Sequence, residues 1–207
     1  MNQKDRMLAG MPYKAWLDGL AEERMENKKK IYEYNHCLPD EDEKIDKLIR
    51  DILGKAGAGI HIEAPFHCDY GKNIEIGDYF FANYNCTILD VGKVIIGDNV
   101  QFAPNVSLYT AGHPIHPDSR NSGYEYGIGI TIGNNVWLSG NVVVNPGVHI
   151  GNNVVIGSGS VVTKDIPDNS VAIGVPAKVV SNFDDYQTKI QNTCTSDSEL
   201  AGIADYR

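Results

Sequence analysis

One histidine in this chain has a sequence context that suits proton transfer. His113 belongs to the stretch Thr-Ala-Gly-His-Pro at 110–114, and Pro114 restricts the backbone of His113 to extended conformations. Imidazole has an unperturbed pKa near 6.5, so it can accept a proton from a hydroxyl group at neutral pH, which typically raises a rate by roughly 10² to 10⁴. We therefore consider two roles for His113, a catalytic base and a structural loop residue.

His113 and His116 also form an H-x-x-H pair, a spacing that could bind a metal ion. A proline follows each histidine, and no third ligand lies close by in the sequence. Because zinc sites use three or four protein ligands, we expect no metal site here.

Two further side chains could contact a ligand. Asn83, in Phe-Ala-Asn-Tyr-Asn at 81–85, could orient a base or donate a hydrogen bond to a developing oxyanion. Asn85 in the same stretch is better explained as a corner residue of the fold. Trp137 directly precedes an aliphatic position, so we expect its indole to point outward, where it could pack on a ligand or on a neighbouring subunit.

The elements that must position these residues repeat with a period of six. Every sixth residue from 132 to 162 is aliphatic, and the residue after each is small or polar. A helix has apolar spacing of 3.6 and a simple strand has a spacing of 2, so this period indicates a hexapeptide solenoid, a parallel β-helix, rather than a β-rich domain with chance spacing. Gly, Asn and Asp suit its corners because they tolerate left-handed backbone angles. The aliphatic column is Ile132, Leu138, Val144, Ile150, Ile156 and Val162.

The period is interrupted once. It begins irregularly near Ile60, shifts by two residues at Val91–Val94, and continues to Leu108. The next positions of the column are Pro114, Arg120 and Tyr126, which are not aliphatic. Residues 109–131 are therefore expected to be a long loop pushed out of the solenoid. Loops of this length without structure of their own are uncommon and are often functional.

The chain divides into three parts. Residues 1–58 are charged and favour helix, with an amphipathic stripe over 40–54 and a weaker helical segment over 20–34. Residues 59–181 would form the solenoid with its extruded loop. Residues 182–207 turn polar and are expected to be a tail of low order with a short helix near 183–190. The expected fold class is mainly β, with an N-terminal α-helical cap.

The composition restricts the partners and the compartment. The net charge of −9 and the pI near 5.0 argue against nucleic acid and anionic membranes as partners, since both select for basic surfaces. No apolar run approaches the roughly 20 residues that span a bilayer, and the N-terminal ten residues lack the apolar core of a secretory signal. The four cysteines are scattered, which suits free thiols in a reducing cytoplasm.

Several motifs together resemble a known family. They are Asn-Tyr-Asn-Cys-Thr-Ile-Leu-Asp at 83–90, Ile-Gly-Asp-Asn-Val at 96–100, Ala-Pro-Asn-Val at 103–106, Thr-Ala-Gly-His-Pro at 110–114, Ile-Gly-Asn-Asn-Val-Trp at 132–137, Val-Thr-Lys-Asp-Ile-Pro at 162–167 and Gly-Val-Pro-Ala-Lys at 174–178. Over about residues 5–182, the sequence resembles the maltose and galactoside O-acetyltransferases.

The resemblance implies a left-handed parallel β-helix that assembles as a homotrimer with active sites between subunits. It implies acetyl transfer from acetyl-CoA to a hydroxyl of a sugar, with His113 as the catalytic base and Asn83 beside it. Asp69, Asn83 and Glu125 would line the acceptor pocket. The positions that would hold CoA are Trp137, Ser139, Gly140, Ser158, Thr163, Lys164 and Lys178.

The chain departs from the family pattern at the acceptor. Family members commonly have an acid four places after the tyrosine that matches Tyr13, whereas here Leu17 holds that position and Asp18 follows. Galactoside-type enzymes also differ at the positions of Asp69, Val91 and Glu125. The sequence therefore does not name the acceptor. Two other function classes are compatible with a hexapeptide solenoid: a zinc lyase of the γ-carbonic-anhydrase type and a non-catalytic binding module.

Overall fold

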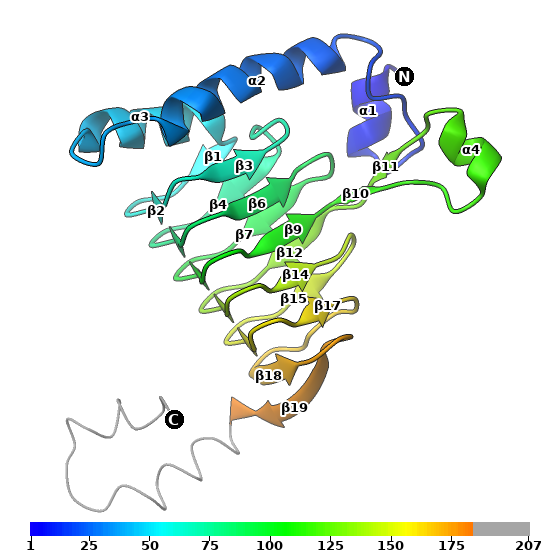
Figure 1. Cartoon of the computed structure of the whole chain (residues 1–207). Helices are drawn as coiled ribbons and strands as arrows, with labels where there is room; N and C mark the ends of the chain where they lie inside the picture. Colours follow the sequence, from blue (N-terminus) through cyan, green and yellow to red (C-terminus); the bar gives the residue numbers. More distant parts are fainter. Residues whose placement is uncertain (184–207) are drawn as a thin grey trace, which may run out of the picture.

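The solenoid is built from three parallel sheets that form its three faces (Figure 1). The structure is a computed structural model that describes residues 1–183. In spatial order, sheet I contains β1 (Lys55–Ala56), β4 (Ile74–Ile76), β7 (Val94–Ile96), β12 (Ile130–Ile132) and β15 (His149–Ile150). Sheet II contains β2 (His61–Ile62), β5 (Phe81–Ala82), β8 (Gln101–Phe102), β13 (Trp137–Leu138), β16 (Val155–Ile156), β18 (Ser170–Ile173) and the antiparallel β19 (Lys178–Asn182). Sheet III contains β3 (Phe66–Cys68), β6 (Cys86–Leu89), β9 (Ser107–Tyr109), β14 (Val143–Val144) and β17 (Val161–Val162).

The aliphatic column forms the centre of the core, as the period of six predicts. All six residues of the column from 132 to 162 are at most 1% exposed. The chain visits sheets I, II and III in turn, so each hexad supplies one side of a turn and the solenoid has about six turns. The expected fold class is therefore confirmed: a mainly β parallel β-helix with an N-terminal helical region.

The register of the strands explains the irregular part of the period. In the later turns Ile132 pairs with Ile150, so one turn spans 18 residues. In an earlier turn Ile74 pairs with Val94, so that turn spans 20 residues, and the two extra residues lie in the segment between sheet III and sheet I. Ile96 pairs with Ile132, which places the whole extruded loop within a single turn.

We name the three edges of the solenoid corners I/II, II/III and III/I, after the sheets that they connect. Left-handed backbone angles occur at seven corner asparagines, as the sequence predicts. Asn85 is one of them, with φ 61°, which confirms its interpretation as a corner residue. Asparagines also hydrogen-bond to each other along corner I/II, for example from Asn135 Nδ2 to Asn153 Oδ1 at 3.0 Å.

The helical cap covers the N-terminal end of the solenoid (Figure 1). Both expected helices are present, α2 (Leu20–Asn35) and α3 (Asp42–Ile52), and their apolar residues join the core of the first turns. The helix α1 (Gln3–Leu8) is not apparent from the sequence pattern; Asn2 caps it by accepting a hydrogen bond from the Asp5 N–H at 2.8 Å. Strand pairing starts at Lys55, within the range 1–58 that the sequence assigns to the cap.

Three further expectations concern membrane-spanning helices, the cysteines and the C-terminal tail. No helix among residues 1–183 is long and apolar enough to cross a membrane. Cys37, Cys68 and Cys86 are free thiols, while Cys194 lies outside the described residues. The helix expected near 183–190 and nearly all of the expected tail also lie outside them.

Candidate active site

The extruded loop expected over residues 109–131 is present and has secondary structure of its own. Its two ends pair as antiparallel strands, β10 (Ala111–Gly112) and β11 (Tyr126–Gly127), and a short helix, α4 (Pro117–Asn121), lies between them. The Tyr126 ring packs over Gly112, where a Cβ would lie 2.4 Å from it. The loop therefore leaves corner III/I as a hairpin with a defined register.

His113 follows β10 directly, and its side chain is exposed. In the hairpin Ala111 pairs with Gly127 and Gly112 with Tyr126. Carried one residue further, this register sets His113 opposite Glu125. Residues directly opposite in an antiparallel pair have side chains on the same face, so an imidazole and a carboxylate would neighbour each other at the mouth of the loop.

Glu125 is held from its other side by the N-terminal segment. Tyr13 and Glu125 form an antiparallel bridge, with backbone N···O distances of 2.9 and 3.0 Å. The Tyr13 hydroxyl also donates to Glu125 Oε2 at 3.0 Å. Tyr13 is fully buried, and burial raises the pKa of its hydroxyl, with the Glu125 charge adding to the shift. Tyr13 therefore remains a hydrogen-bond donor at neutral pH.

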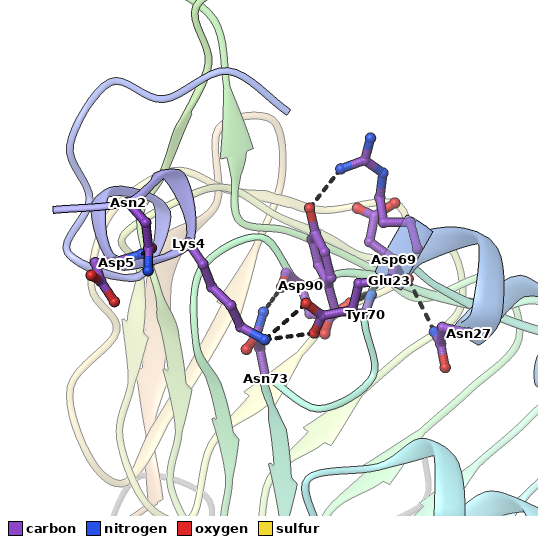
Figure 2. A network of polar contacts seen from close by, with 10 residues as sticks. Asn2, Lys4, Asp5, Glu23, Asn27, Asp69, Tyr70, Asn73 and Asp90 are labelled. Carbon is purple, nitrogen blue, oxygen red and sulfur yellow. Dashed lines mark hydrogen bonds and ion pairs between the residues drawn. The ribbon is translucent and has the colours of Figure 1, made fainter. Parts of the chain in front are cut away.

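Asp69 lies at the same corner, and a buried carboxylate organises its backbone (Figure 2). Asp90 Oδ1 accepts the N–H groups of Asp69 and Tyr70, both at 2.9 Å, and Asn73 donates to the Asp90 carbonyl at 2.7 Å. Asp90 is 0% exposed, and its Oδ2 has no hydrogen-bond partner among residues 1–183. Burial raises the pKa of Asp90 to about 6 and also raises the pKa of Asp69.

Helix α2 supplies further polar groups to corner III/I. Arg24 Nη1 donates to the Tyr70 hydroxyl at 2.6 Å, and Asn27, labelled in Figure 2, donates to the Asp69 carbonyl at 3.0 Å. Arg24 and Lys28 both lower the pKa of Asp69, against the larger effect of burial, so their positive charges face this carboxylate. The cap thus forms one wall of the corner that contains Asp69 and Glu125.

Asp18 has a structural role near the N-terminus. Its Oδ2 accepts the N–H of Gln3 at 2.8 Å, and its backbone is left-handed, with φ 55°. Leu17 is 41% exposed. The side chain of Asp18 is therefore engaged at the start of α1.

Asn83 lies at a different corner, II/III, together with several residues predicted to bind CoA. The strands before them pair as Ala82 with Phe102 and Phe102 with Leu138, so Asn83 and Ser139 belong to one column with Ala103 between them. Ser139 is buried, Gly140 and Asn83 are partly buried, and Ser158 is exposed in the next turn. A Cβ at Gly140 would meet only Pro104 O at 3.6 Å, and one at Gly159 would meet nothing within 4 Å, so the corner is open to solvent.

The remaining predicted CoA residues are divided between corners. Trp137 points outward from sheet II, as expected, with 45% of its surface exposed, and lines a hollow of about 400 Å³ with Asn99, Gln101 and Asn135. Lys178 begins β19 near corner II/III, where Ala177 N–H donates to Val161 O at 2.8 Å. Thr163 and Lys164 are exposed at corner III/I. Within residues 1–183 neither lysine has an ion-pair partner.

Within one chain, the structure therefore places Asp69 and Glu125 near each other at corner III/I, with His113 on the hairpin that leaves this corner, whereas Asn83 and Ser139 lie at corner II/III. Sequence reasoning missed Asp90, Tyr70 and Arg24. Asp90 did carry a signal, an acid between apolar residues in Ile-Leu-Asp-Val, directly before the two-residue shift of the period. Among the described residues, no group of three or more His, Cys, Asp or Glu side chains could hold a metal ion.

The fold and this arrangement define a hexapeptide-repeat transferase. Residues 129–164 match the model of the bacterial transferase hexapeptide with six repeats, and residues 6–57 match the maltose acetyltransferase hexapeptide capping motif.

The chain belongs to the family of the galactoside and maltose O-acetyltransferases. It is 48% identical over 185 residues to a galactoside O-acetyltransferase of Escherichia coli K12, covering 89% of this chain and 91% of the relative. A crystal structure of a maltose O-acetyltransferase from Clostridium difficile 630 is 51% identical, with a TM-score of 0.87, over 88% of this chain and 97% of that chain. A galactoside acetyltransferase in complex with coenzyme A is 47% identical, with a TM-score of 0.88, over 91% and 94% of the two chains.

Proposed function

We propose that this protein transfers the acetyl group of acetyl-CoA to a hydroxyl group of a sugar, such as maltose, glucose or a galactoside-like acceptor. The observation that carries the proposal is the hairpin at corner III/I, in which His113 directly follows β10 and Glu125 directly precedes its partner β11, in a chain that belongs to this family. The similar structure that contains coenzyme A supports the choice of acyl donor.

The proposed chemistry is a direct transfer with His113 as the general base. His113 accepts the proton of the sugar hydroxyl while the oxygen attacks the carbonyl carbon of the thioester. The tetrahedral intermediate collapses, the carbon–sulfur bond breaks, and His113 donates the proton to the departing CoA sulfur. The products are the acetyl ester and free CoA. Asn83 and neighbouring donors stabilise the oxyanion.

Carboxylates are suited to hold the acceptor. Sugar hydroxyl groups donate hydrogen bonds, and ionised Asp and Glu side chains act only as acceptors. We assign Asp69 and Glu125 to this role, together with the Asn83 amide. Glu125 has one oxygen engaged by Tyr13, and Oε1 has no hydrogen-bond partner in residues 1–183.

The open corner II/III fits an elongated donor molecule. Gly140 and Gly159 leave its backbone uncovered, and the exposed Trp137 lies on the adjacent face. CoA carries several negative phosphate charges, and the protein itself has a net charge of −9, so CoA binding needs local positive charge on the protein. Lys164 and Lys178 can supply it. The proposed set is completed by Ser139, Ser158 and Thr163.

The two corners imply a multi-chain site. A small acceptor cannot reach His113 and Asn83 across sheet III of one chain, so we propose a homotrimer in which one subunit provides corner III/I and its neighbour provides corner II/III. Nucleic acid and membrane partners are not expected for an acidic chain of this kind. We also propose a cytoplasmic location, which the free thiols support.

A screen of acceptors tests this function. The purified protein is incubated with acetyl-CoA and one of a panel of disaccharides, monosaccharides, thio-sugars and simple alcohols, and released CoA is measured as free thiol. We expect sugar-dependent thiol release and an acetylated sugar of matching mass. Thiol release that no sugar increases would contradict the proposal.

A further inference from the structure

The N-terminal segment between α1 and α2 contacts the proposed acceptor site through one side chain. Tyr13 is joined to Glu125 by two backbone hydrogen bonds and by its hydroxyl, although 112 residues separate the two in sequence. A purely structural junction would need only the backbone bridge. The hydroxyl adds a third bond, which ends on a carboxylate oxygen.

The strands place Tyr13 in line with the proposed base. Glu125 is bridged to Tyr13 on one side, and on the other the register of β10 and β11 sets it opposite His113. The same register extends in the other direction, where Ile128 N–H donates to Thr110 O at 2.9 Å. Glu125 therefore joins Tyr13 on one side and directly precedes β11 on the other, while His113 directly follows the paired strand β10.

The hydroxyl of Tyr13 engages only half of the carboxylate. It donates to Oε2, whereas Oε1 has no partner within the described part of the chain. A free glutamate side chain has three rotatable bonds, so fixing one oxygen reduces the number of positions that the other can occupy. A carboxylate held in this way can accept a hydroxyl from a ligand without first losing that freedom.

We propose that Tyr13 is a positioning residue for the acceptor: its hydroxyl holds Glu125 so that Oε1 receives a sugar hydroxyl beside His113. The inference rests on the proposed function and extends it, because it makes the segment before α2 a determinant of acceptor affinity.

Other contacts hold the segment in place independently of this hydroxyl. A Cβ on Gly123 would lie 1.9 Å from the Trp16 ring, so the indole packs directly on the backbone of the loop. Lys14 Nζ lies 5.0 Å from the centre of the Tyr124 ring, within cation–π range. Replacing the hydroxyl alone should therefore leave the segment docked on the loop.

Steady-state kinetics of Tyr13→Phe, with the best acceptor of the screen, test the inference. We expect the KM for the sugar to rise about fivefold to tenfold, the range that one lost hydrogen bond typically gives. The KM for acetyl-CoA should stay unchanged. In a Glu125→Ala background, Tyr13→Phe should have no further effect on the KM for the sugar, because the two residues act as one unit.

Tyr124→Phe is the matched control, because it removes a hydroxyl from the residue next to Glu125 without changing the hydrogen bond from Tyr13. We expect its KM values for the sugar and for acetyl-CoA to equal those of the wild type. An active wild type whose sugar KM is unchanged by Tyr13→Phe would overturn the inference and leave the function standing. The inference would also be overturned, with the function left standing, if Tyr13→Phe raised the KM for the sugar and the KM for acetyl-CoA together. It would likewise be overturned if the effects of Tyr13→Phe and Glu125→Ala on the KM for the sugar were additive. A wild type that acetylates no sugar would overturn both.

Discussion

Asn83 and His113 lie at different corners of the same solenoid. Asn83 follows β5 and turns from sheet II into sheet III, whereas His113 follows β10 in the loop between sheets III and I. The whole width of sheet III separates the two corners. If both residues serve one reaction, each active site needs two chains.

Mixed trimers should restore activity that neither parent has. Asn83→Ala and His113→Ala proteins, each nearly inactive alone, are unfolded together at equal concentration and refolded. Random assembly leaves a wild-type Asn83 facing a wild-type His113 at about one interface in four, so we expect about a quarter of wild-type activity. Light scattering should give three times the chain mass. No recovery from a correctly assembled mixture would place both residues in the same chain's site or outside the site.

His113→Ala should lower kcat at least about a hundredfold, the lower end of what positioned proton transfer contributes. Acetyl-CoA binding should be nearly unchanged. His116→Ala is the internal control: His116 Nδ1 lies 3.9 Å from Asp118 Oδ2 at the exposed start of α4, and its loss should cost little.

The same two variants separate a transferase from a zinc lyase. If His113 were a zinc ligand, purified wild type should contain about one metal per subunit, since three imidazoles hold zinc tightly. Stoichiometric zinc that disappears from both variants together with activity would refute the acetyltransferase assignment.

Replacing Lys164 and Lys178 by Glu should weaken CoA binding at least about tenfold, because two charges that would attract its phosphates become repulsive. Calorimetric titration with CoA measures the affinity, and circular dichroism checks the fold. The double variant Lys29→Glu and Lys47→Glu makes the same change of net charge on the exposed side of the cap and should bind CoA like the wild type. Equal affinities in the two double variants would remove Lys164 and Lys178 from the site.

Asp90 should make the protein less stable as the pH rises. Its pKa is raised from the ordinary 3.8 to about 6, so between these values the folded state binds more protons than the unfolded state, and the free energy of unfolding falls with increasing pH. The loss amounts to about 3 kcal/mol and is complete above about pH 7. Asp90→Asn should remove this pH-dependent loss of stability, because an amide does not titrate.

Urea unfolding at fixed protein concentration measures this effect. The free energy of unfolding of Asp90→Asn minus that of the wild type should be larger at about pH 8 than at about pH 4. Asp98→Asn is the control, because Asp98 also accepts a backbone N–H, from Asp78 at 2.7 Å, but is exposed. A difference between wild type and Asp90→Asn that does not change with pH would show that Asp90 keeps its ordinary pKa in the folded protein.

Much of the solenoid could be predicted from the sequence because its signal is local and repeated. Each buried column residue, such as Leu138 or Ile156, recurs six positions after the last, and each corner asparagine meets the same backbone requirement. The end of the period after Leu108 marks where the loop leaves the solenoid, although the hairpin within that loop leaves no such pattern.

The site depended on tertiary structure, because its contacts join segments that have no pattern in common. Arg24 meets Tyr70 across 46 residues, and Tyr13 meets Glu125 across 112. Which corner each residue occupies follows from the register of the stacked turns, including the two extra residues at corner III/I and the loop inserted there. The sequence alone determined the repeat and the candidate base, and only the stacking of turns decided that Asp69 and Glu125 lie at corner III/I while Asn83 lies at corner II/III.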